Sequence, residues 1–186
     1  VSIVTGDGPT VGSAIIERVD YLTFTGSSAT GRVVAEQAGR NLIDCSLELS
    51  GKNPMIILDD ADIGEAVRGA IQGSFTNAGQ LCLANERIYV HEEVYEEFLD
   101  EFVEQTEALT LGAEFEFGAD VGSLIDSDQL DRVQSHVADA VESGATVHAG
   151  GNARSEVGPY FYEPTILTDV PATSLPACEE TFGPLA

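Results

Sequence analysis

The stretch that decides the fold class is VDYLTFTGSSATGRVVAEQAGRNLIDCSLEL, residues 19–49. Its first apolar run, VDYLTFTG, ends at Gly26 and predicts a strand. The next part, SSATGRVVAEQAGRN, predicts a helix because Val33, Val34 and Ala38 fall on one side at helical spacing. LIDCSLEL then predicts a second strand. This order is typical of a βαβ unit, so we expect an α/β fold with a largely parallel sheet.

The same alternation of strands and helices extends to both sides of this stretch. Upstream, the β-branched run Val1–Thr5 predicts a strand, and we expect a helix from about Thr10. Downstream, the pattern predicts strands in KNPMIILDD, ERIYVHE and ATVHAGG and an extended stretch in PYFYEPTILTDV. It predicts helices in DADIGEAVRGAIQGSF, EVYEEFLDEFVEQTEALTL and DSDQLDRVQSHVADAVESG, and a loop in GAEFEFGADVGSL.

The composition indicates a globular chain. With 186 residues, 43 % of them hydrophobic, the chain can form a packed core. It lacks both an apolar run of roughly 18 residues, which a membrane span needs, and a secretory signal. It starts at Val1 rather than Met and stops at TFGPLA without a helix cap or a polar tail. We therefore expect a fragment of a longer protein.

The charge is strongly negative, with 32 acidic residues against 8 basic ones and a net charge of −24. Such a field repels phosphate backbones, which argues against nucleic acid as a partner. The acids lie on the polar faces of amphipathic segments, and Lys52 is the single lysine. We expect a halophilic protein, whose self-repulsion high salt would screen. The alternative is an ordinary acidic protein of the cytosol.

Three cysteines, Cys45, Cys82 and Cys178, are widely spaced and form no CxxC pair. This spacing predicts no zinc site, and we expect no metal. An odd number of cysteines in a chain without a secretory signal favours reduced thiols and a cytoplasmic location.

Two segments around the βαβ unit have residue types that suit chemistry. In FTGSSATG, Gly26 allows a close approach and Ser27 can cap a helix whose N-terminus favours a pyrophosphate; a simple turn is the alternative. In LELSGK, Glu48 stands between Leu47 and Leu49. Burial there would raise its pKa toward that of a general base. The alternative is a Glu at a strand end, paired with a base such as Lys52 or Arg87.

Two further segments follow. In NAGQLC, Gly79 permits a turn or a close approach, and Cys82 would be a nucleophile if local positive potential lowered its pKa. No histidine is near it in sequence, since the three are His91, His136 and His148. A lone cysteine is more often a buried, inert thiol. EETFGP by itself predicts a turn with exposed charges, in which Phe182 packs its ring.

In this order and spacing, the four segments resemble the aldehyde dehydrogenase family over essentially the whole chain. The family patterns are Phe-Thr-Gly-Ser-x-x-x-Gly, Leu-Glu-Leu-Gly-Gly-Lys, Gly-Gln-x-Cys and Glu-Glu-x-Phe-Gly-Pro. The corresponding segments here are FTGSSATG, LELSGK, GQLC and EETFGP. Ser50 replaces a glycine of the family, and would be strained if that position required a positive φ. Cys178 stands where a basic residue is common.

The resemblance implies the roles of the site residues. Cys82 would be the catalytic nucleophile and Glu48 the general base, whereas Lys52 would be structural. NAD or NADP would be the cofactor, with Thr25 and Leu49 beside the nicotinamide and Glu180 on its ribose. The residues implied to contact the cofactor are Thr25, Gly26, Ser27, Leu49, Glu180 and Phe182. The reaction would oxidise an aldehyde, on the wording of the motifs succinate semialdehyde, to its acid through a cysteine thiohemiacetal and thioester.

The resemblance also implies an incomplete, Rossmann-like parallel-sheet fold. Residues 1–49 would be the C-terminal part of the NAD(P)-binding domain, and residues 50–186 the catalytic domain, truncated at its C-terminus. The family's oxyanion asparagine lies upstream of the matched region, so we expect this chain to be inactive alone. The family forms dimers or tetramers, which implies a homo-oligomeric parent. The competing hypothesis is a scaffold that kept the fold and lost the chemistry.

Overall fold

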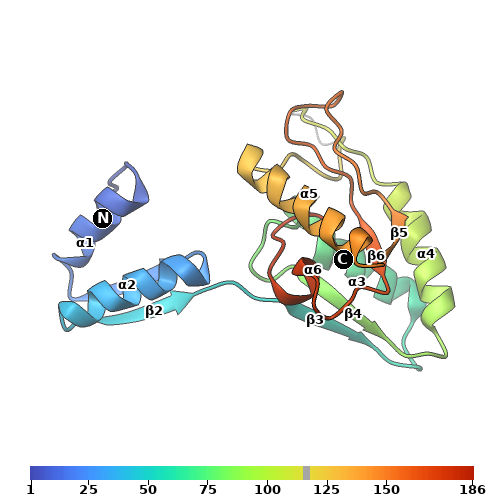
Figure 1. Ribbon diagram of the computed structural model, residues 1–186, viewed down its shortest axis with the longest axis horizontal. Helices are drawn as coiled ribbons and strands as arrows, with labels where there is room; N and C mark the ends of the chain where they lie inside the picture. The colour runs from blue at the N-terminus through green and yellow to red at the C-terminus, as the bar shows by residue number, and fades with distance from the viewer. Residues whose placement is uncertain (115–117) are drawn as a thin grey trace. The chain divides into compact units, whose positions relative to one another are not determined.

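The computed structural model describes residues 1–114 and 118–186 and divides into two compact units (Figure 1). Unit 1 is Val1–Ser50 and unit 2 is Gly51–Ala186. The expected boundary between residues 49 and 50 lies one residue before this division.

Unit 1 contains the βαβ unit that the sequence predicts. It begins with a five-residue π-helix, Gly8–Gly12, and a short helix α1 (Ser13–Ile16). Strand β1 (Tyr21–Thr25), helix α2 (Ser28–Arg40) and strand β2 (Asp44–Glu48) follow. The two strands pair in parallel, from Tyr21 opposite Asp44 to Thr25 opposite Glu48, and the prediction for residues 19–49 is confirmed.

The predicted strand at Val1–Thr5 is wrong. These residues are exposed and form no strand, while the predicted helix after them is present. A β-branched run favours extended backbone, but a strand is stable only when a neighbour accepts and donates its backbone hydrogen bonds. Within the described part of unit 1, β1 and β2 pair only with each other, so residues 1–5 have no such neighbour.

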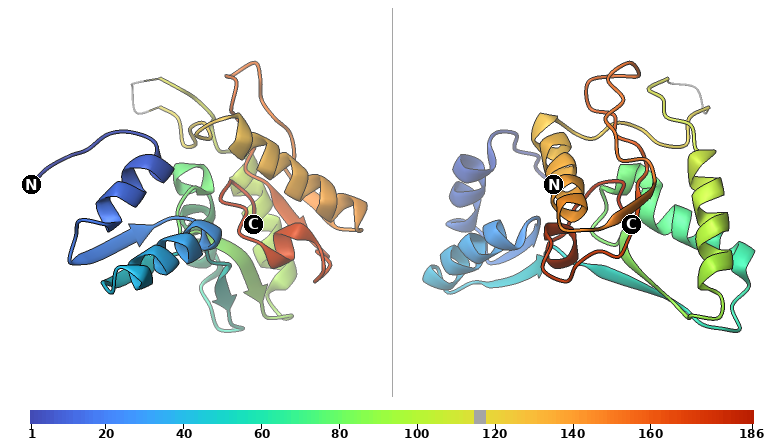
Figure 2. Two further views of the ribbon diagram at one scale, coloured as in Figure 1. Left: turned by 60° about the vertical axis from the view of Figure 1, so that its left-hand side comes forward. Right: turned by 45° about the vertical axis from the view of Figure 1, so that its right-hand side comes forward.

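Unit 2 contains the predicted elements in the predicted order: β3 (Asn53–Ile57), α3 (Ile63–Phe75), β4 (Asn85–Val90), α4 (Tyr95–Glu107), α5 (Ser127–Glu142), β5 (Thr146–Ala149) and β6 (Ile166–Thr168). It also contains two elements that were not predicted, a 3-10 turn (Thr76–Gly79) and the short helix α6 (Leu175–Cys178). Figure 2 shows α5 alongside α6 and β6. In the predicted loop between α4 and α5, residues 115–117 lie outside the described part.

The pairing of the strands agrees with the expected parallel sheet at β3 and β4, but β5 and β6 are antiparallel. The difference follows from the connections. Helix α3 joins β3 to β4, and a helical crossover returns the chain in the same direction. The segment between β5 and β6 contains no helix, and it reverses the chain.

The ends of α3 and α5 carry residues that favour a helix terminus. The Asp62 carboxylate caps α3 by accepting the Glu65 N–H at 3.0 Å, and Asp126 caps α5 by accepting the Gln129 N–H at 2.9 Å. Gly144, just after α5, has a φ of +110°, as is typical of a residue that ends a helix.

Two apolar clusters form the core of unit 2. In the first, residues of α3 and α4 pack against Ile57 of β3 and Ile166 of β6. The ring of Phe102 stacks on Phe75, with centroids 5.9 Å apart, and on Phe98, at 5.4 Å. The second cluster joins α5 to β6 and to the last residues of the chain through Val121, Leu124, Val133, Val137, Ala140, Leu167 and Leu185.

The outer face of α4 is acidic, as the sequence predicts. Its exposed residues include Glu96, Glu97, Asp100, Glu104 and Glu107, opposite buried Phe98 and Phe102. In the described ranges, no helix is both long enough and apolar enough to cross a bilayer.

We expect Phe102→Ala to lower the free energy of unfolding by about 3–5 kcal/mol, because it removes a fully buried ring and leaves a cavity between α3 and α4. Urea unfolding followed by circular dichroism measures this change. Val141→Ala is the control, since Val141 is 45 % exposed on α5 and its truncation leaves no cavity. Equal losses in the two variants would contradict the assignment of Phe102 to the core.

Candidate active site

Cys82 lies on the connection between α3 and β4, which folds back sharply after Phe75. Asn77 and Ala78 both have a φ of +55°, and Gly79 has a φ of +70°. A Cβ atom at Gly79 would overlap the carbonyl oxygen of Gly183, so the backbones of these two glycines pack directly against each other. The predicted close approach at Gly79 is therefore present, and its partner is the EETFGP segment.

Gln80 ties this turn to the residues that precede α5. Its Oε1 accepts the Ile125 N–H at 2.8 Å, and its Nε2 donates to the carbonyls of Asn77 at 3.1 Å and Ser123 at 3.3 Å. The amide side chain thus satisfies backbone groups of two segments that no regular secondary structure connects.

Asn53 fixes the backbone at Cys82 from the side of β3. Its Nδ2 donates to the carbonyl oxygens of Cys82 at 2.8 Å and of Ala84 at 2.9 Å. Cys82 itself is exposed, so the alternative of a buried, inert thiol is wrong for this residue. Sequence reasoning missed Asn53, because an amide next to a strand carries no sign of the distant carbonyl that it binds.

The other two cysteines differ from Cys82 in their surroundings. Cys45 is half-buried on β2, and Cys178 is exposed at the end of α6, where its Sγ donates to the Ala172 carbonyl at 3.2 Å. Only Cys82 lies on a turn that side chains fix from two sides.

Glu180 and Phe182 lie in the segment 179–184, which is neither helix nor strand. The Glu180 Oε1 accepts the Gly51 N–H at 3.4 Å, so this carboxylate contacts the residue that follows Ser50 in LELSGK. Phe182 has a φ of +55°, an unfavourable value for a bulky side chain. The structure thus brings Glu180 to Gly51 and places the Cys82 turn against Gly183.

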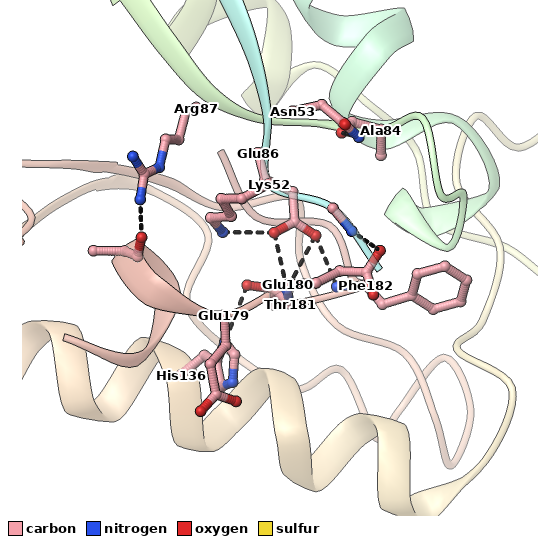
Figure 3. A network of polar contacts seen from close by, with 12 residues as sticks. Lys52, Asn53, Ala84, Glu86, Arg87, His136, Glu179, Glu180, Thr181 and Phe182 are labelled. Atoms are coloured by element: carbon pink, nitrogen blue, oxygen red, sulfur yellow. Dashed lines mark hydrogen bonds and ion pairs between the residues drawn. The ribbon is translucent and has the colours of Figure 1, made fainter. Parts of the chain in front are cut away.

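Glu86 is a site residue that the sequence analysis missed. It is only 8 % exposed, and its carboxylate accepts the Thr181 N–H at 2.9 Å and the Phe182 N–H at 2.8 Å (Figure 3). The same carboxylate forms an ion pair with the Lys52 Nζ at 2.5 Å. A glutamate inside the apolar run ERIYV was the available signal, since carboxylates are rarely buried without a partner.

Lys52, to which the resemblance assigns a structural role, forms a buried ion pair with Glu86. Burial lowers the pKa of its ammonium group below 10.5, and the Glu86 carboxylate opposes that shift. Lys52 and Arg87 were the bases considered as partners for Glu48. Lys52 instead pairs with Glu86, and the Arg87 guanidinium donates to the Ala177 carbonyl.

Three residues on one face of α5 hold the same segment. The Gln129 Nε2 donates to the carbonyls of Thr181 at 3.0 Å and Phe182 at 2.7 Å. The Arg132 Nε donates to the Glu180 carbonyl at 3.1 Å, and His136 shares a hydrogen bond of 3.1 Å with the Thr181 hydroxyl. Sequence reasoning missed these contacts as well.

The remaining predicted residues meet in unit 1, at the carboxyl ends of β1 and β2. The Gly26 N–H donates to the Glu48 carbonyl at 3.0 Å, and Thr25 is the neighbour of Glu48 in the register. The Ser27 hydroxyl accepts the Thr30 N–H at 3.1 Å and caps α2, as predicted. Leu49 packs against Gly31, where a Cβ atom would overlap it.

The expectation that Glu48 is buried is wrong. Side chains alternate along β2, so Cys45 and Leu47 point inward while Asp44, Ser46 and Glu48 are exposed. The leucines beside Glu48 in sequence therefore lie on the other face of the strand. Ser50 is not among the residues with a positive φ, so its replacement of glycine causes no strain there.

Comparison with known proteins gives consistent matches. A sequence model described as "Aldehyde dehydrogenase family" matches residues 1–186. A putative succinate-semialdehyde dehydrogenase (NADP+) of Mycolicibacterium smegmatis is 53 % identical over 184 residues, which are 99 % of this chain and 36 % of that protein. Succinate-semialdehyde dehydrogenase (NADP+) GabD of Escherichia coli is 43 % identical over 187 residues, 100 % of this chain and 39 % of that protein.

Solved structures agree with these matches. A crystal structure of an NADP-dependent enzyme of Escherichia coli has a TM-score of 0.94 at 43 % identity, covering 98 % of this chain and 38 % of that one. A crystal structure of a succinate-semialdehyde dehydrogenase of Burkholderia pseudomallei has a TM-score of 0.93 at 42 % identity. The match covers 98 % of this chain and 38 % of that one. The fold is therefore part of that of these proteins, and the chain spans little more than a third of their length.

His136 predicts a pH dependence of the site. It is 2 % exposed, and burial lowers the pKa of its imidazole below 6.5, as do the charges of Arg132 and Lys52. Below pH 6.5, His136 is therefore protonated in the unfolded chain but still neutral in the folded one, down to its lower folded pKa. The stability is complete above pH 6.5 and declines, by up to about 1.4 kcal/mol per pH unit, as pH falls toward the folded pKa.

Urea unfolding at several pH values above the range of the carboxylates measures this slope. We expect His136→Gln to flatten it, because glutamine has no proton to gain. His91→Gln is the control, since His91 is exposed outside the core, and it should keep the wild-type slope. An unchanged slope in His136→Gln would contradict the prediction.

Proposed function

Because the chain belongs to the aldehyde dehydrogenase family, we propose that the protein carrying it oxidises an aldehyde to a carboxylic acid with NAD or NADP. The observation that carries this proposal is the exposed Cys82, on a turn whose backbone Asn53 and Gln80 hold in place. A thiol fixed in this way suits a nucleophile, because the entropy cost of orienting it has already been met by the fold.

Cys82 and Glu48 perform the chemistry in this proposal. The Cys82 thiolate attacks the aldehyde carbon, and a C–S bond forms as the carbonyl oxygen becomes an oxyanion, toward which the Cys82 N–H can donate. The C–H bond then breaks and a thioester remains on Cys82. Glu48 takes a proton from water, the resulting hydroxide attacks the thioester carbon, and the C–S bond breaks to release the acid and the thiolate.

The residues of unit 1 suit a dinucleotide. NAD(P)+, when bound, supplies the acceptor for the hydride that the thiohemiacetal loses. The N-terminus of α2, thirteen residues long, follows β1 directly at Gly26, and a helix N-terminus beyond a parallel strand favours a pyrophosphate. We assign the nicotinamide to Thr25 and Leu49, the pyrophosphate to Gly26 and Ser27, and the nicotinamide ribose to Glu180, with Phe182 packed nearby.

In this assignment, unit 1 is the end of the NAD(P)-binding domain and unit 2 is the catalytic domain. The names of the relatives support succinate semialdehyde as the substrate and NADP as the cofactor. The parent protein would be a cytoplasmic homo-oligomer, a dimer or tetramer, with reduced cysteines.

A non-catalytic scaffold is the competing function. Such a protein has no need of a nucleophile or a general base, yet Cys82 and Glu48 are both retained, and Cys82 is exposed on a fixed turn. These observations favour the enzyme.

The test uses the full-length protein that carries this chain, with succinate semialdehyde and each cofactor, followed by absorbance of the reduced cofactor. We expect Cys82→Ser to lower kcat by at least about 10³-fold. We expect Glu48→Gln to lower the steady-state rate by roughly 10²–10⁴-fold while a first-turnover burst remains, because the base acts only on the thioester.

Two controls complete this test. The 186-residue chain alone should show no aldehyde oxidation. Iodoacetamide labelling with mass spectrometry should modify Cys82 faster than Cys45 or Cys178. Full activity of Cys82→Ser, or equally slow labelling of all three cysteines, would favour the scaffold instead.

The net charge of −24 supports a second proposal, adaptation to high salt. We expect the melting temperature of the chain to rise by several degrees between about 0.1 M and about 1 M KCl, because the screening length falls from about 10 Å to about 3 Å. A variant with Glu96, Glu97, Asp100 and Glu104 of α4 changed to Gln or Asn should respond less. A melting temperature independent of KCl would contradict this proposal.

A further inference from the structure

The segment that carries Glu180 is held by side chains on both sides. We call the set Lys52, Glu86, Gln129, Arg132 and His136 the clamp, and Figure 3 labels Lys52, Glu86 and His136 of this set. On one side, Glu86 of β4 accepts the two consecutive N–H groups of Thr181 and Phe182. On the other, Gln129 and Arg132 of α5 donate to the three consecutive carbonyls of residues 180–182.

The clamp replaces the backbone hydrogen bonds that this segment lacks. Residues 180–182 form neither helix nor strand, and their peptide groups make no hydrogen bond to another backbone group in the described structure. Side chains that bind both the N–H and the carbonyl groups leave this piece of backbone little freedom to rotate. The segment is therefore ordered by residues that lie about fifty and about ninety-five positions away in the sequence.

Phe182 shows that the clamp works against a local preference. Its φ of +55° is unfavourable for a bulky residue, and such a conformation persists only when the surroundings fix it. Both of its peptide groups are held, the N–H by Glu86 at 2.8 Å and the carbonyl by Gln129 at 2.7 Å. Such strain is concentrated where a precise backbone position serves a ligand.

The buried charges of the clamp support the same conclusion. Stability alone does not require Lys52 and Glu86, because well-packed apolar residues are often as stable as a buried ion pair. A carboxylate gives what an apolar residue does not, two acceptor oxygens of fixed geometry for adjacent amides. Lys52 supplies the positive charge that pairs with this carboxylate inside the protein.

We infer that Glu86 and Gln129 are positioning residues, which hold Thr181 and Phe182 so that the Glu180 carboxylate stays in place for the vicinal hydroxyls of a ribose. The Glu180 carbonyl is fixed by Arg132 and its carboxylate contacts the Gly51 N–H, so its position follows from the clamp. This inference rests on the role proposed above for Glu180. The clamp residues themselves act through Glu180 and Phe182.

The first test is Gln129→Ala in the full-length protein. Gln129 is half-buried and uncharged, so its truncation leaves no buried charge unpaired, and we expect the fold to be kept. We expect KM for the cofactor to rise roughly threefold to tenfold, the worth of one or two hydrogen bonds. KM for the aldehyde and the rate of Cys82 labelling by iodoacetamide should stay unchanged. Gln134→Ala is the matched control, because Gln134 is exposed on the same helix.

The second test removes the other side of the clamp without leaving an unpaired buried charge. We expect Lys52→Met combined with Glu86→Gln to raise KM for the cofactor and to speed hydrogen exchange at the amides of Thr181 and Phe182. Exchange in α3 and α4, outside the clamp, should remain as in the wild type. This local exchange is measurable in the 186-residue chain as well.

Several outcomes would overturn the inference. One is a cofactor KM of Gln129→Ala within about twofold of Gln134→Ala. Another is a rise in KM for aldehyde and cofactor alike with slower Cys82 labelling, which would indicate a merely structural role. Unchanged exchange at Thr181 and Phe182 in the double variant would also overturn it. If the wild type oxidises no aldehyde, the proposed function fails, and exchange alone decides whether the clamp holds the segment.

Discussion

The buried carboxylate of Glu86 is the interaction on which the rest of unit 2 depends. It lies on β4, pairs with Lys52 at the entry to β3, and accepts two amides of the segment that follows α6. One side chain therefore connects the paired strands β3 and β4 to a segment that no backbone ladder joins to them. If either charge were removed alone, the other would remain buried and unpaired, a loss that typically costs several kcal/mol.

The Cys82 turn and the Glu180 segment support each other through the same region. Gly79 packs directly against the backbone of Gly183, a contact that leaves no space for a side chain at residue 79, and Val133 of α5 leaves none at residue 183. The segment is in turn held by Glu86 and α5, so the surface that the Cys82 turn packs on is itself fixed. The position of the nucleophile in the turn and that of Glu180 therefore depend on one packed unit rather than on two independent loops.

The sequence predicted the parts of this structure that depend on local chemistry. Helical spacing located α2 to α5, Ser27 was predicted to cap α2, and the order of four short segments indicated the family. The errors arose where the outcome depends on a partner. Val1–Thr5 lacks a strand to pair with, and Glu48 is exposed because its neighbouring leucines lie on the other face of β2.

The residues missed in the site share one property. Asn53, Glu86 and Gln129 act by binding backbone groups far away in sequence, and a backbone carbonyl or amide has no residue identity that a pattern could reveal. Glu86 was the one with a signal, a charge within an apolar strand. The rule that a glutamate among apolar residues is buried was applied to Glu48, which is exposed at the end of β2. It was not applied to Glu86, which is buried.

The distribution of charge gives the clamp a further property. Most ion pairs in the described residues are exposed, such as Arg40 with Glu36 and Arg68 with Glu65, and salt screens pairs of this kind. Lys52 and Glu86 have side chains only 14 % and 3 % exposed, so mobile ions have little access to them. In a protein whose acidic surface is proposed to work in high salt, the single lysine is placed where salt does not weaken it. The geometry around Glu180 would then be maintained under conditions in which the surface electrostatics are screened.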